Sequence, residues 1–390
     1  MKILFVTSTP LEYSSSANMR NIALINGFIE LGYEVSTLSS DIEKNSKYID
    51  KTLVDIKFKN RYWISNSTIH ENMTKKSNEE NSLKSSIKTK LIKFIYKIYS
   101  KLTIYDSRKS LVNKLANIRI DEEFDLIISS SDPKSSHLIA KKLLEINPKI
   151  AKKWIQYWGD PFCIDINKRS CLPKSFIKKE EEKLIKACDC VVYVSPFTLD
   201  KQQQIYKKYT EKMKFLPIPY KKEIIYPKTN NKYTILGYFG DYNSKDRNIV
   251  PLYNTVEKMD IGLEICGNSD FVLESTEKIR ILPRQKMDII REKEKNVDLL
   301  VCVCNKSGTQ IPGKVYHYAA TNKPILLILD GENRKELKEY FERFNRYIIC
   351  ENTEESIEQI IKEKISIKEN YCPSDEFKST TIANKFIELL

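Results

Sequence analysis

Short apolar runs alternate with amphipathic stretches along the chain. Residues 3–7 and 33–38 are two strand-sized runs, and between them apolar side chains recur every three or four residues over 22–31. This order predicts a β-α-β unit whose parallel strands are buried on both faces. The same alternation continues with predicted strands at 124–129, 154–158, 190–194 and 214–216, and with predicted helices at 134–144, 175–187 and after Pro196.

A polar stretch at 221–232 has the composition of a linker, and the alternation restarts beyond it. Here the pattern predicts strands at 234–239, 262–266, 298–304, 324–329 and 347–350, and helices at 250–258, 286–293, 314–320, 334–343 and 354–364. We therefore expect an α/β protein with two doubly wound, Rossmann-like domains facing across a cleft. The expected boundaries are 1–222 for the first domain, 223–232 for the linker and 233–372 for the second domain. A C-terminal helix within 373–390 is expected to pack back on the first domain.

The basic charge of the chain is confined to its first part. The 390 residues carry a formal net charge of +13, but residues 1–232 carry +16 and the remainder carries −3. Nine basic residues and one acid fall between Lys84 and Lys114, where apolar residues recur at helical spacing. This segment predicts a basic amphipathic helix suited to an anionic membrane surface, although a packed helix with a solvated lysine face fits the same pattern.

Other sequence signals indicate a cytoplasmic location. The nine cysteines include no Cys-x-x-Cys pair, which is typical of buried thiols in a reducing compartment. The N-terminus has no signal-peptide pattern, and no apolar stretch reaches the 18 residues that a membrane span needs. We therefore expect a cytoplasmic protein, with peripheral attachment to the inner face of the membrane if the basic segment binds lipid.

Several spacing signatures are absent from the sequence. It contains no GxGxxG after its first strand, no GxxxxGK[ST], no HExxH and no GxSxG, which disfavours classical NAD, P-loop and α/β-hydrolase chemistry. No two aspartates are two residues apart, so an Asp-x-Asp metal clamp for a diphosphate is also missing. Any diphosphate would have to be bound by backbone amides and basic side chains.

The segment 307–314 is suited to that task. Gly308 and Gly313 allow unusual backbone angles in the loop that follows a predicted buried strand, and Lys314 lies in the first turn of the next predicted helix. The amides at a helix start attract anions, and a cation there opposes the helix dipole unless an anion lies nearby. A solvated lysine after an ordinary loop is the alternative.

The run from Ile311 to Ile325 resembles the donor-site segment of GT-B glycosyltransferases, in particular the retaining family-4 type, where a PGK-x-x-E-Y-x-A-T-x-K-P-I pattern is common. Residues 237–240 with Arg247 and Asn248 resemble the opening of the donor domain. The loops at 129–137 and 159–161 resemble acceptor-domain loops at strand ends.

The resemblance implies a transfer reaction. A nucleotide sugar would bind the second domain and a glycan or lipid-linked acceptor the first, in bacterial-type surface polysaccharide synthesis with retention. It further implies that neither a metal nor a cofactor is needed. In this sequence Thr309 and His317 occupy the positions of the two acids in the E-x7-E motif of the family, so the donor identity departs from the pattern.

The candidate site residues follow from the resemblance and from the predicted strand ends. Asp160, at a predicted strand end, is expected to orient or deprotonate the acceptor hydroxyl, and His137 to face the donor phosphate or the acceptor. The loop residues Ser15, Ser16 and Arg20 are expected to line the cleft. The expected donor-binding residues are Arg247, Arg284, Thr309, Gln310, Gly313, Lys314 and His317.

Two other functions fit the same sequence. One is a sugar-nucleotide epimerase of the same fold, and the other is a nucleotide-sugar-binding subunit without catalysis, which the missing acids at 309 and 317 favour. Nucleic acid is not an expected partner, because the basic residues lack a recognised reader motif.

Overall fold

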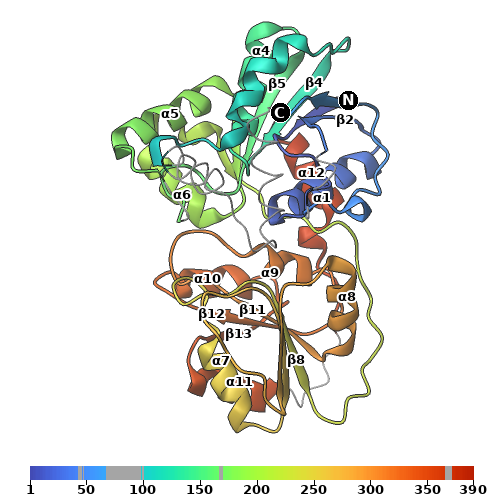
Figure 1. Ribbon diagram of the computed structural model, residues 1–390, viewed down its shortest axis with the longest axis vertical. Coiled ribbons are helices and arrows are strands. Elements are labelled where there is room, and N and C mark those ends of the chain that lie inside the picture. Colours follow the sequence, from blue (N-terminus) through green and yellow to red (C-terminus); the bar gives the residue numbers. More distant parts are fainter. Residues whose placement is uncertain (43–45, 47, 67–97, 99–100, 167–169, 365–370) are drawn as a thin grey trace, which may run out of the picture. The chain divides into compact units, whose positions relative to one another are not determined.

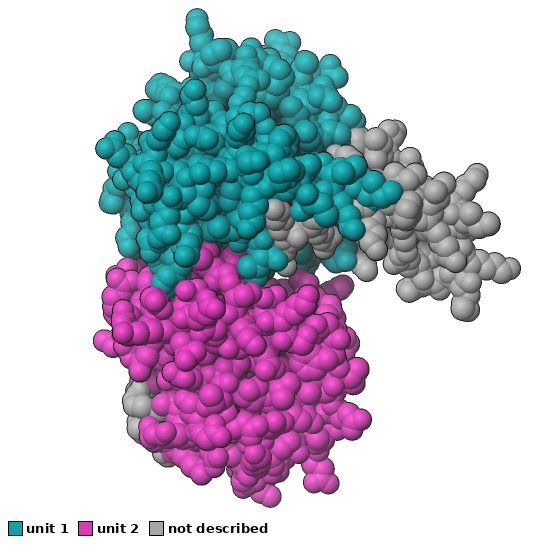
Figure 2. All heavy atoms as spheres, turned by 90° about the vertical axis from the view of Figure 1, so that its left-hand side faces the viewer, with its two compact units in different colours: residues 1–217, 379–390 teal, residues 218–378 magenta. Residues whose placement is uncertain are grey.

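The computed structural model describes residues 1–42, 46, 48–66, 98, 101–166, 170–364 and 371–390. The chain divides into two compact units, formed by Met1–Pro217 with Ser379–Leu390 and by Ile218–Lys378 (Figure 2). Each unit is an α/β structure around one parallel sheet (Figure 1). The predicted fold class, with two doubly wound Rossmann-like sheets, is confirmed.

Unit 1 contains a seven-stranded parallel sheet in the order β3-β2-β1-β4-β5-β6-β7. Its strands are β1 (Lys2–Val6), β2 (Glu34–Ser40), β3 (Arg61–Ile64), β4 (Phe124–Ser130), β5 (Ala151–Trp158), β6 (Cys190–Tyr193) and β7 (Met213–Phe215). Its α-helices are α1 (Ser16–Glu30), α4 (Ser135–Ile146), α5 (Lys174–Ala187), α6 (Pro196–Ile205) and α12 (Ser379–Ile387). Short 3-10 helices occur at η1 (Lys51–Leu53), η3 (Ser107–Asn117) and η4 (Lys207–Lys212).

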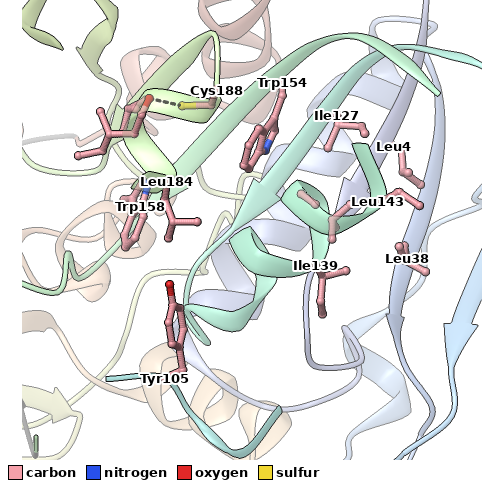
Figure 3. Close-up of a cluster of buried hydrophobic side chains, with 14 of the residues drawn as sticks. Leu4, Leu38, Tyr105, Ile127, Ile139, Leu143, Trp154, Trp158, Leu184 and Cys188 are labelled. Carbon is pink, nitrogen blue, oxygen red and sulfur yellow. Dashed lines mark hydrogen bonds between the residues drawn. The ribbon is translucent and has the colours of Figure 1, made fainter. Parts of the chain in front are cut away.

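Both faces of this sheet are buried, as the short apolar runs predict. Leu4 lies in a cluster with Trp154 and with residues of α4 and α5 (Figure 3). Val6 belongs to the same cluster. Their neighbours Ile3 and Phe5 are equally buried, because successive side chains of a strand point to opposite faces. A strand with both faces covered therefore has a continuous apolar sequence.

Helix α12 packs against α1 in unit 1. The ring of Phe386 lies 6.1 Å from that of Phe28 on α1 and 5.1 Å from that of Tyr157 on β5. A β-carbon added to Gly27 would lie 2.1 Å from the carbonyl oxygen of Ser379. The absence of a side chain at Gly27 is thus what allows the two helices to approach so closely.

Unit 2 contains a six-stranded parallel sheet in the order β10-β9-β8-β11-β12-β13. Its strands are β8 (Ile235–Phe239), β9 (Gly262–Cys266), β10 (Ile279–Leu282), β11 (Leu299–Val303), β12 (Ile325–Leu329) and β13 (Ile348–Glu351). Its helices are α7 (Val250–Lys258), α8 (Met287–Asn296), α9 (Gly313–Tyr318), α10 (Arg334–Glu342), α11 (Glu354–Lys364) and the 3-10 helix η5 (Asp375–Phe377). One face of the sheet packs against α7 and α11 through Leu252, Val256, Ile357 and Ile361.

The predicted basic helix over 84–114 is tested only in its last part, because 84–97, 99 and 100 lie outside the described residues. From Ser107 to Asn117 the chain forms a 3-10 helix, so the prediction of an α-helix through Lys114 is wrong there. Asp106 caps this segment, and Leu111 and Leu115 are buried against the core of unit 1. Arg108 is also buried, with Nη1 donating to Ser40 Oγ at 2.7 Å.

Within the part of the chain that the structure describes, every helix is too short or too polar to cross a bilayer. The nine cysteines form no disulfides, and six of them are buried.

We predict that Gly27→Ala destabilises unit 1, because the new methyl group would overlap the backbone of Ser379 and force α12 away from α1. Overpacking of this kind costs roughly 1–3 kcal/mol. Urea unfolding of the full chain should show the loss, and Asn26→Ala on the same helix serves as the control with a change of less than about 0.5 kcal/mol. Equal stability of the two variants would contradict the packing described for Gly27.

Candidate functional site

The candidate functional side chains of unit 2 lie at the carboxyl end of its sheet, where β8 and β11 are neighbours. The chain leaves β8 toward β9 on one side, while β11 lies on the other, so this is the point at which the strand order reverses. Ligands of doubly wound sheets bind in the crevice at such a point. Arg247 lies in the loop after β8, and Asn305 lies two residues beyond the end of β11.

Arg247 joins these two loops. Its Nε and Nη2 donate to Asn305 Oδ1 at 3.2 and 2.8 Å, and its Nη1 donates to the carbonyl of Asp241 at 3.2 Å. Both acceptor atoms are neutral oxygens. Among the described residues no carboxylate is ion-paired with Arg247, so its positive charge is oriented by the loops without being neutralised.

Lys314, in the first turn of α9, is the second cation at this edge. Its Nζ lies 5.3 Å from the centre of the Tyr318 ring, and no carboxylate of the described segments is ion-paired with it. Burial, and then the charge of Lys314, lower the pKa of His317 to about 4. His317 is therefore neutral at pH 7 and suited to a hydroxyl group rather than to an ion pair with phosphate.

The other residues predicted to bind the donor in unit 2 differ in their contacts. Thr309 donates its backbone N–H to Gln310 Oε1 at 3.2 Å, and Asn305 Nδ2 donates to the carbonyl of Gln310 at 3.3 Å. Gly313 starts α9. Arg284 lies farther out, exposed, with Nη1 3.3 Å from Asp241 Oδ2.

Close backbone approach shapes the neighbouring loops. A β-carbon on Gly267 would lie 1.9 Å from the carbonyl oxygen of Gly240. Glycine at 267 thus lets the loop after β9 lie directly against the loop after β8. Gly308 has a φ of 81°, a conformation that glycine adopts without strain.

Unit 1 has a corresponding polar cluster where β1 and β4 are neighbours at the carboxyl end of the sheet. Arg20 of α1, which follows β1, is only 4% exposed. Its Nη2 donates to Ser130 Oγ at 3.1 Å and to the carbonyl oxygen of Ser131, and its guanidinium lies 4.5 Å from the centre of the Tyr157 ring. Arg20, which was expected to line the cleft, is therefore buried and hydrogen-bonded to the end of β4. Ser15 caps α1 by accepting from the N–H of Asn18, and Ser16 is exposed.

The loops after β4 and β5 meet at Gly159, whose N–H donates to Ser131 Oγ at 3.0 Å. A β-carbon at Gly159 would lie 2.7 Å from Arg20 Nη1 and 3.5 Å from Asp132 Oδ2. The missing side chain thus lets the arginine and the carboxylate come close to this loop. The next residue along the chain is Asp160.

Asp160 belongs to a compact group of acids around one lysine. Lys134 Nζ lies 3.2 Å from Asp132 Oδ1 and 2.6 Å from Asp165 Oδ2. Burial lowers the pKa of Lys134, but the two carboxylates outweigh this effect and raise it overall. Burial and the adjacent Asp132 raise the pKa of Asp160 to about 7, against the attraction of Lys134. A carboxyl group that titrates near neutrality is suited to accept or donate a proton in the physiological range.

His137 is fully buried on α4. Its Nδ1 is 2.8 Å from Ser129 Oγ, which also accepts a hydrogen bond from Trp154 Nε1 at 2.8 Å. The imidazole stacks on Trp158 with ring centres 4.1 Å apart. Burial, then Arg20 and Lys134, lower the pKa of His137 well below its usual range. The ring is therefore neutral and has no surface exposed to a substrate, which favours a positioning role over direct proton transfer.

Sequence reasoning did not single out two residues that matter for this geometry. One is Asn305, whose place two residues beyond a buried strand is a usable signal. The other is Asp132, whose influence on Asp160 depends on a contact that the sequence does not display. Among the described residues no group of three or more His, Cys, Asp or Glu side chains is arranged to hold a metal ion.

The two sheets with their switch-point sites define the GT-B fold, and comparison with solved structures supports this assignment. TarM aligns with a TM-score of 0.55 at 11% identity, covering 100% of this chain and 98% of its own. The lipopolysaccharide outer core galactosyltransferase WaaB gives 0.52 at 12% identity, with 100% and 99% covered. A UDP-forming trehalose-phosphate synthase from Burkholderia xenovorans gives 0.53 at 9% identity, with 100% and 94% covered.

The comparisons of sequence, unlike those of structure, found no match. No family model matches the chain, and no curated protein matches its sequence. The predicted GT-B fold is confirmed by the structural likeness, which at these identities concerns the fold.

We predict that Asp160→Asn changes how stability depends on pH. The folded-state pKa of about 7 exceeds the unfolded value near 4, so between these pH values the folded chain holds a proton that the unfolded chain lacks. Stability of the wild type should therefore fall as the pH rises from about 4 to about 7. The variant lacks this loss and should be more stable than the wild type at pH 8, by up to roughly 4 kcal/mol for a shift of about three pKa units, but not at pH 4.

Urea unfolding at the two pH values measures the effect. Asp121→Asn, on the surface of unit 1, is the matched control and should change stability by a similar small amount at both. A difference between Asp160→Asn and the wild type that is the same at pH 4 and pH 8 would rule out the raised pKa.

Proposed function

We propose that the protein is a glycosyltransferase that moves a sugar from a nucleotide-sugar donor to a glycan or lipid-linked acceptor. Unit 2 would bind the donor and unit 1 the acceptor, in bacterial-type surface polysaccharide biosynthesis. The observation that carries the proposal is the pair of cations at the switch point of the sheet of unit 2, Arg247 and Lys314, neither of which is ion-paired with a carboxylate of the described residues. The similarity of the 311–325 segment to retaining family-4 enzymes supports retention of configuration.

The donor diphosphate would be stabilised by these two cations without a metal. A guanidinium held in place by neutral oxygens keeps its charge for an incoming anion, and it needs little reorganisation when negative charge grows on the leaving phosphate. Neutral His317 would contribute a hydrogen bond to a hydroxyl of the ribose or sugar. Arg284, Thr309 and Gln310 would line the outer part of the same site.

On the acceptor side, Asp160 would orient the attacking hydroxyl group. In a retaining transfer the leaving phosphate is itself able to take the hydroxyl proton, so Asp160 need not be a strong base. His137 would act by fixing Ser129 and Trp158 at the strand ends.

We predict that Arg247→Met and Lys314→Met weaken binding of the donor nucleotide. Loss of one charge-assisted contact to phosphate should raise the Kd by roughly ten- to a hundredfold. Calorimetric titration against UDP-, GDP-, ADP-, CMP- and dTDP-sugars first identifies the donor, and the two variants are then titrated with it. Lys362→Met, on the exposed face of α11, is the control and should bind as the wild type does.

Failure of every nucleotide sugar to bind the wild type would overturn the proposal. If a donor binds, incubation with it alone separates transfer from epimerisation, because only an epimerase converts the donor without an acceptor. Transfer to an added acceptor excludes a non-catalytic binding subunit.

We also propose that the basic segment 84–114 attaches unit 1 to an anionic membrane surface at the inner face of the cell membrane. In its described part Lys101 is exposed, whereas Lys114 donates to the carbonyls of Ser65 and Asn66 at 3.1 and 2.6 Å. Lys109 is also exposed, so membrane contact would depend on Lys109 and on the basic residues before Arg108.

For this contact we predict flotation of the full chain with phosphatidylserine vesicles at low salt, and its loss near 0.5 M NaCl, because the attraction is screened. Replacing Lys84, Lys88, Lys90 and Lys93 with Gln should abolish flotation. Replacing the same number of lysines on α5 (Lys174, Lys178, Lys179 and Lys183) is the matched control. A wild-type chain that stays unbound at low salt would remove the membrane proposal and leave the enzymatic one intact.

A further inference from the structure

The loop at residues 159–165 follows β5 and carries Asp160. Its two ends are held by the hydrogen bond from Gly159 and by the ion pair of Asp165 described above. A third attachment lies between these ends, at the backbone of Cys163. Neither the donor site nor the acceptor residues named so far explain this third attachment.

Glu181 of α5 provides it. The N–H of Cys163 donates to Glu181 Oε2 at 2.9 Å. Tyr206 Oη lies 3.0 Å from the same oxygen and 3.2 Å from Cys163 Sγ, so both the backbone and the side chain of Cys163 are linked to this pair. Gln202 Nε2 on α6 donates to the other oxygen, Oε1, at 3.2 Å. The carboxyl group of Glu181 thus connects the 159–165 loop to two helices.

Glu181 is a fully buried carboxyl group that is surrounded by hydrogen-bond donors. Burial raises its pKa overall, against the hydrogen bonds from Cys163 and Tyr206 and the attraction of Lys134. Three donors point at its two oxygens, which favours the ionised form. A buried network whose members are all satisfied is rigid, because the loss of one acceptor leaves several donors unpaired.

Phe162 connects the attachment at Cys163 to the position of Asp160. It directly precedes Cys163 and is buried. Its ring lies 5.1 Å from that of Tyr105 and 5.7 Å from that of Trp158. With Phe162 packed and Cys163 hydrogen-bonded, the loop has little freedom to move Asp160 toward water. Burial is the largest cause of the raised pKa of Asp160, so this restraint also bears on its ionisation.

We propose that Glu181 is a positioning residue that holds the 159–165 loop so that Asp160 meets the acceptor hydroxyl group. The inference rests on the proposed function as far as the reaction is concerned, but the position of Asp160 in the folded chain is measurable without any substrate. Asp160 is the group that would touch the substrate. Glu181 acts through the N–H of Cys163, since its own oxygens are buried.

The ionisation of Asp160 reports its position. The full chain is labelled with isotope-enriched aspartate and titrated by carbon NMR, and the signal of Asp160 is the one absent from Asp160→Asn. In the wild type it should titrate with a pKa of about 7. In Glu181→Met the loop loses its attachment and water reaches the carboxyl group, so this pKa should fall by about one unit or more. The other charges near Asp160, on Asp132, Lys134 and Asp165, are the same in both proteins. An unchanged pKa would overturn the proposal.

Two controls separate position from charge and from stability. Glu181→Gln removes the charge but keeps an acceptor for Cys163, because its amide oxygen is able to replace Oε2, which receives two of the three hydrogen bonds. Gln202→Leu removes a buried hydrogen bond to the same carboxylate and leaves the one from Cys163. Both variants should keep the pKa of Asp160 unchanged. A fall in either of them as large as in Glu181→Met would overturn the positioning role.

Glu181→Met leaves three buried donors without their acceptor and is at risk of not folding. Glu181→Asp is the second variant, because it keeps the carboxylate but is one methylene group shorter and draws back from Cys163. The pKa of Asp160 should fall in this variant as well, by a smaller amount. If Glu181→Met does not fold, Glu181→Asp decides, and a pKa equal to that of the wild type would contradict the proposal.

Transfer kinetics test the link to the reaction. With the donor that calorimetry identifies and an acceptor that the wild type uses, Glu181→Met should lower kcat by about ten- to a hundredfold, because a displacement of about 1 Å is enough for such a loss. Glu181→Gln should retain most of the wild-type rate, and the Kd for the donor should stay the same in both. An unchanged kcat in Glu181→Met would overturn the positioning role. A wild-type chain without transfer activity would instead overturn the proposed function and leave the NMR result standing.

Discussion

One arginine in each unit ties together the two loops at the point where the strand order reverses. At such a point neighbouring loops run away from each other to opposite faces of the sheet, which opens a crevice and leaves polar backbone groups exposed. Arg20 spans it in unit 1 by binding Ser130 and Ser131 at the end of β4, and Arg247 spans it in unit 2 by binding Asn305 after β11. In each unit the arginine thus holds together the strand ends that carry the candidate site, which includes Asp160 in unit 1 and Lys314 in unit 2.

The two arginines nevertheless have different environments. Arg20 is buried under Tyr157 and beside Asp132, so its charge is used within the protein. Arg247 is half-buried, and neutral oxygens hold it. An arginine at the switch point thus has a structural role in unit 1, where it is Arg20. In unit 2 the positive charge of Arg247 remains available to a ligand.

The sequence predicted the buried strands well, because a strand covered on both faces is apolar throughout. Two strands, β3 and β10, were not predicted. Each has four residues and lies at the edge of its sheet, where only part of the strand is buried and the apolar signal is weak. The candidate site was predicted less completely than the fold. Arg247, Lys314 and Asp160 stand out by residue type and place, but the raised pKa of Asp160 and the contacts of Glu181 depend on burial and on distant neighbours.

The close contact between Gly27 and Ser379 also bears on the order in which the molecule is made. Helix α12 belongs to unit 1 but follows all of unit 2 in the chain. During synthesis, residues 218–378 are translated before the last helix of unit 1, so most of unit 2 is available to fold before unit 1 has all of its elements. Until α12 arrives, Phe28 and Tyr157 lack their partner Phe386, and the nascent first unit exposes an apolar face. Unit 1, although translated first, is thus the last to be finished.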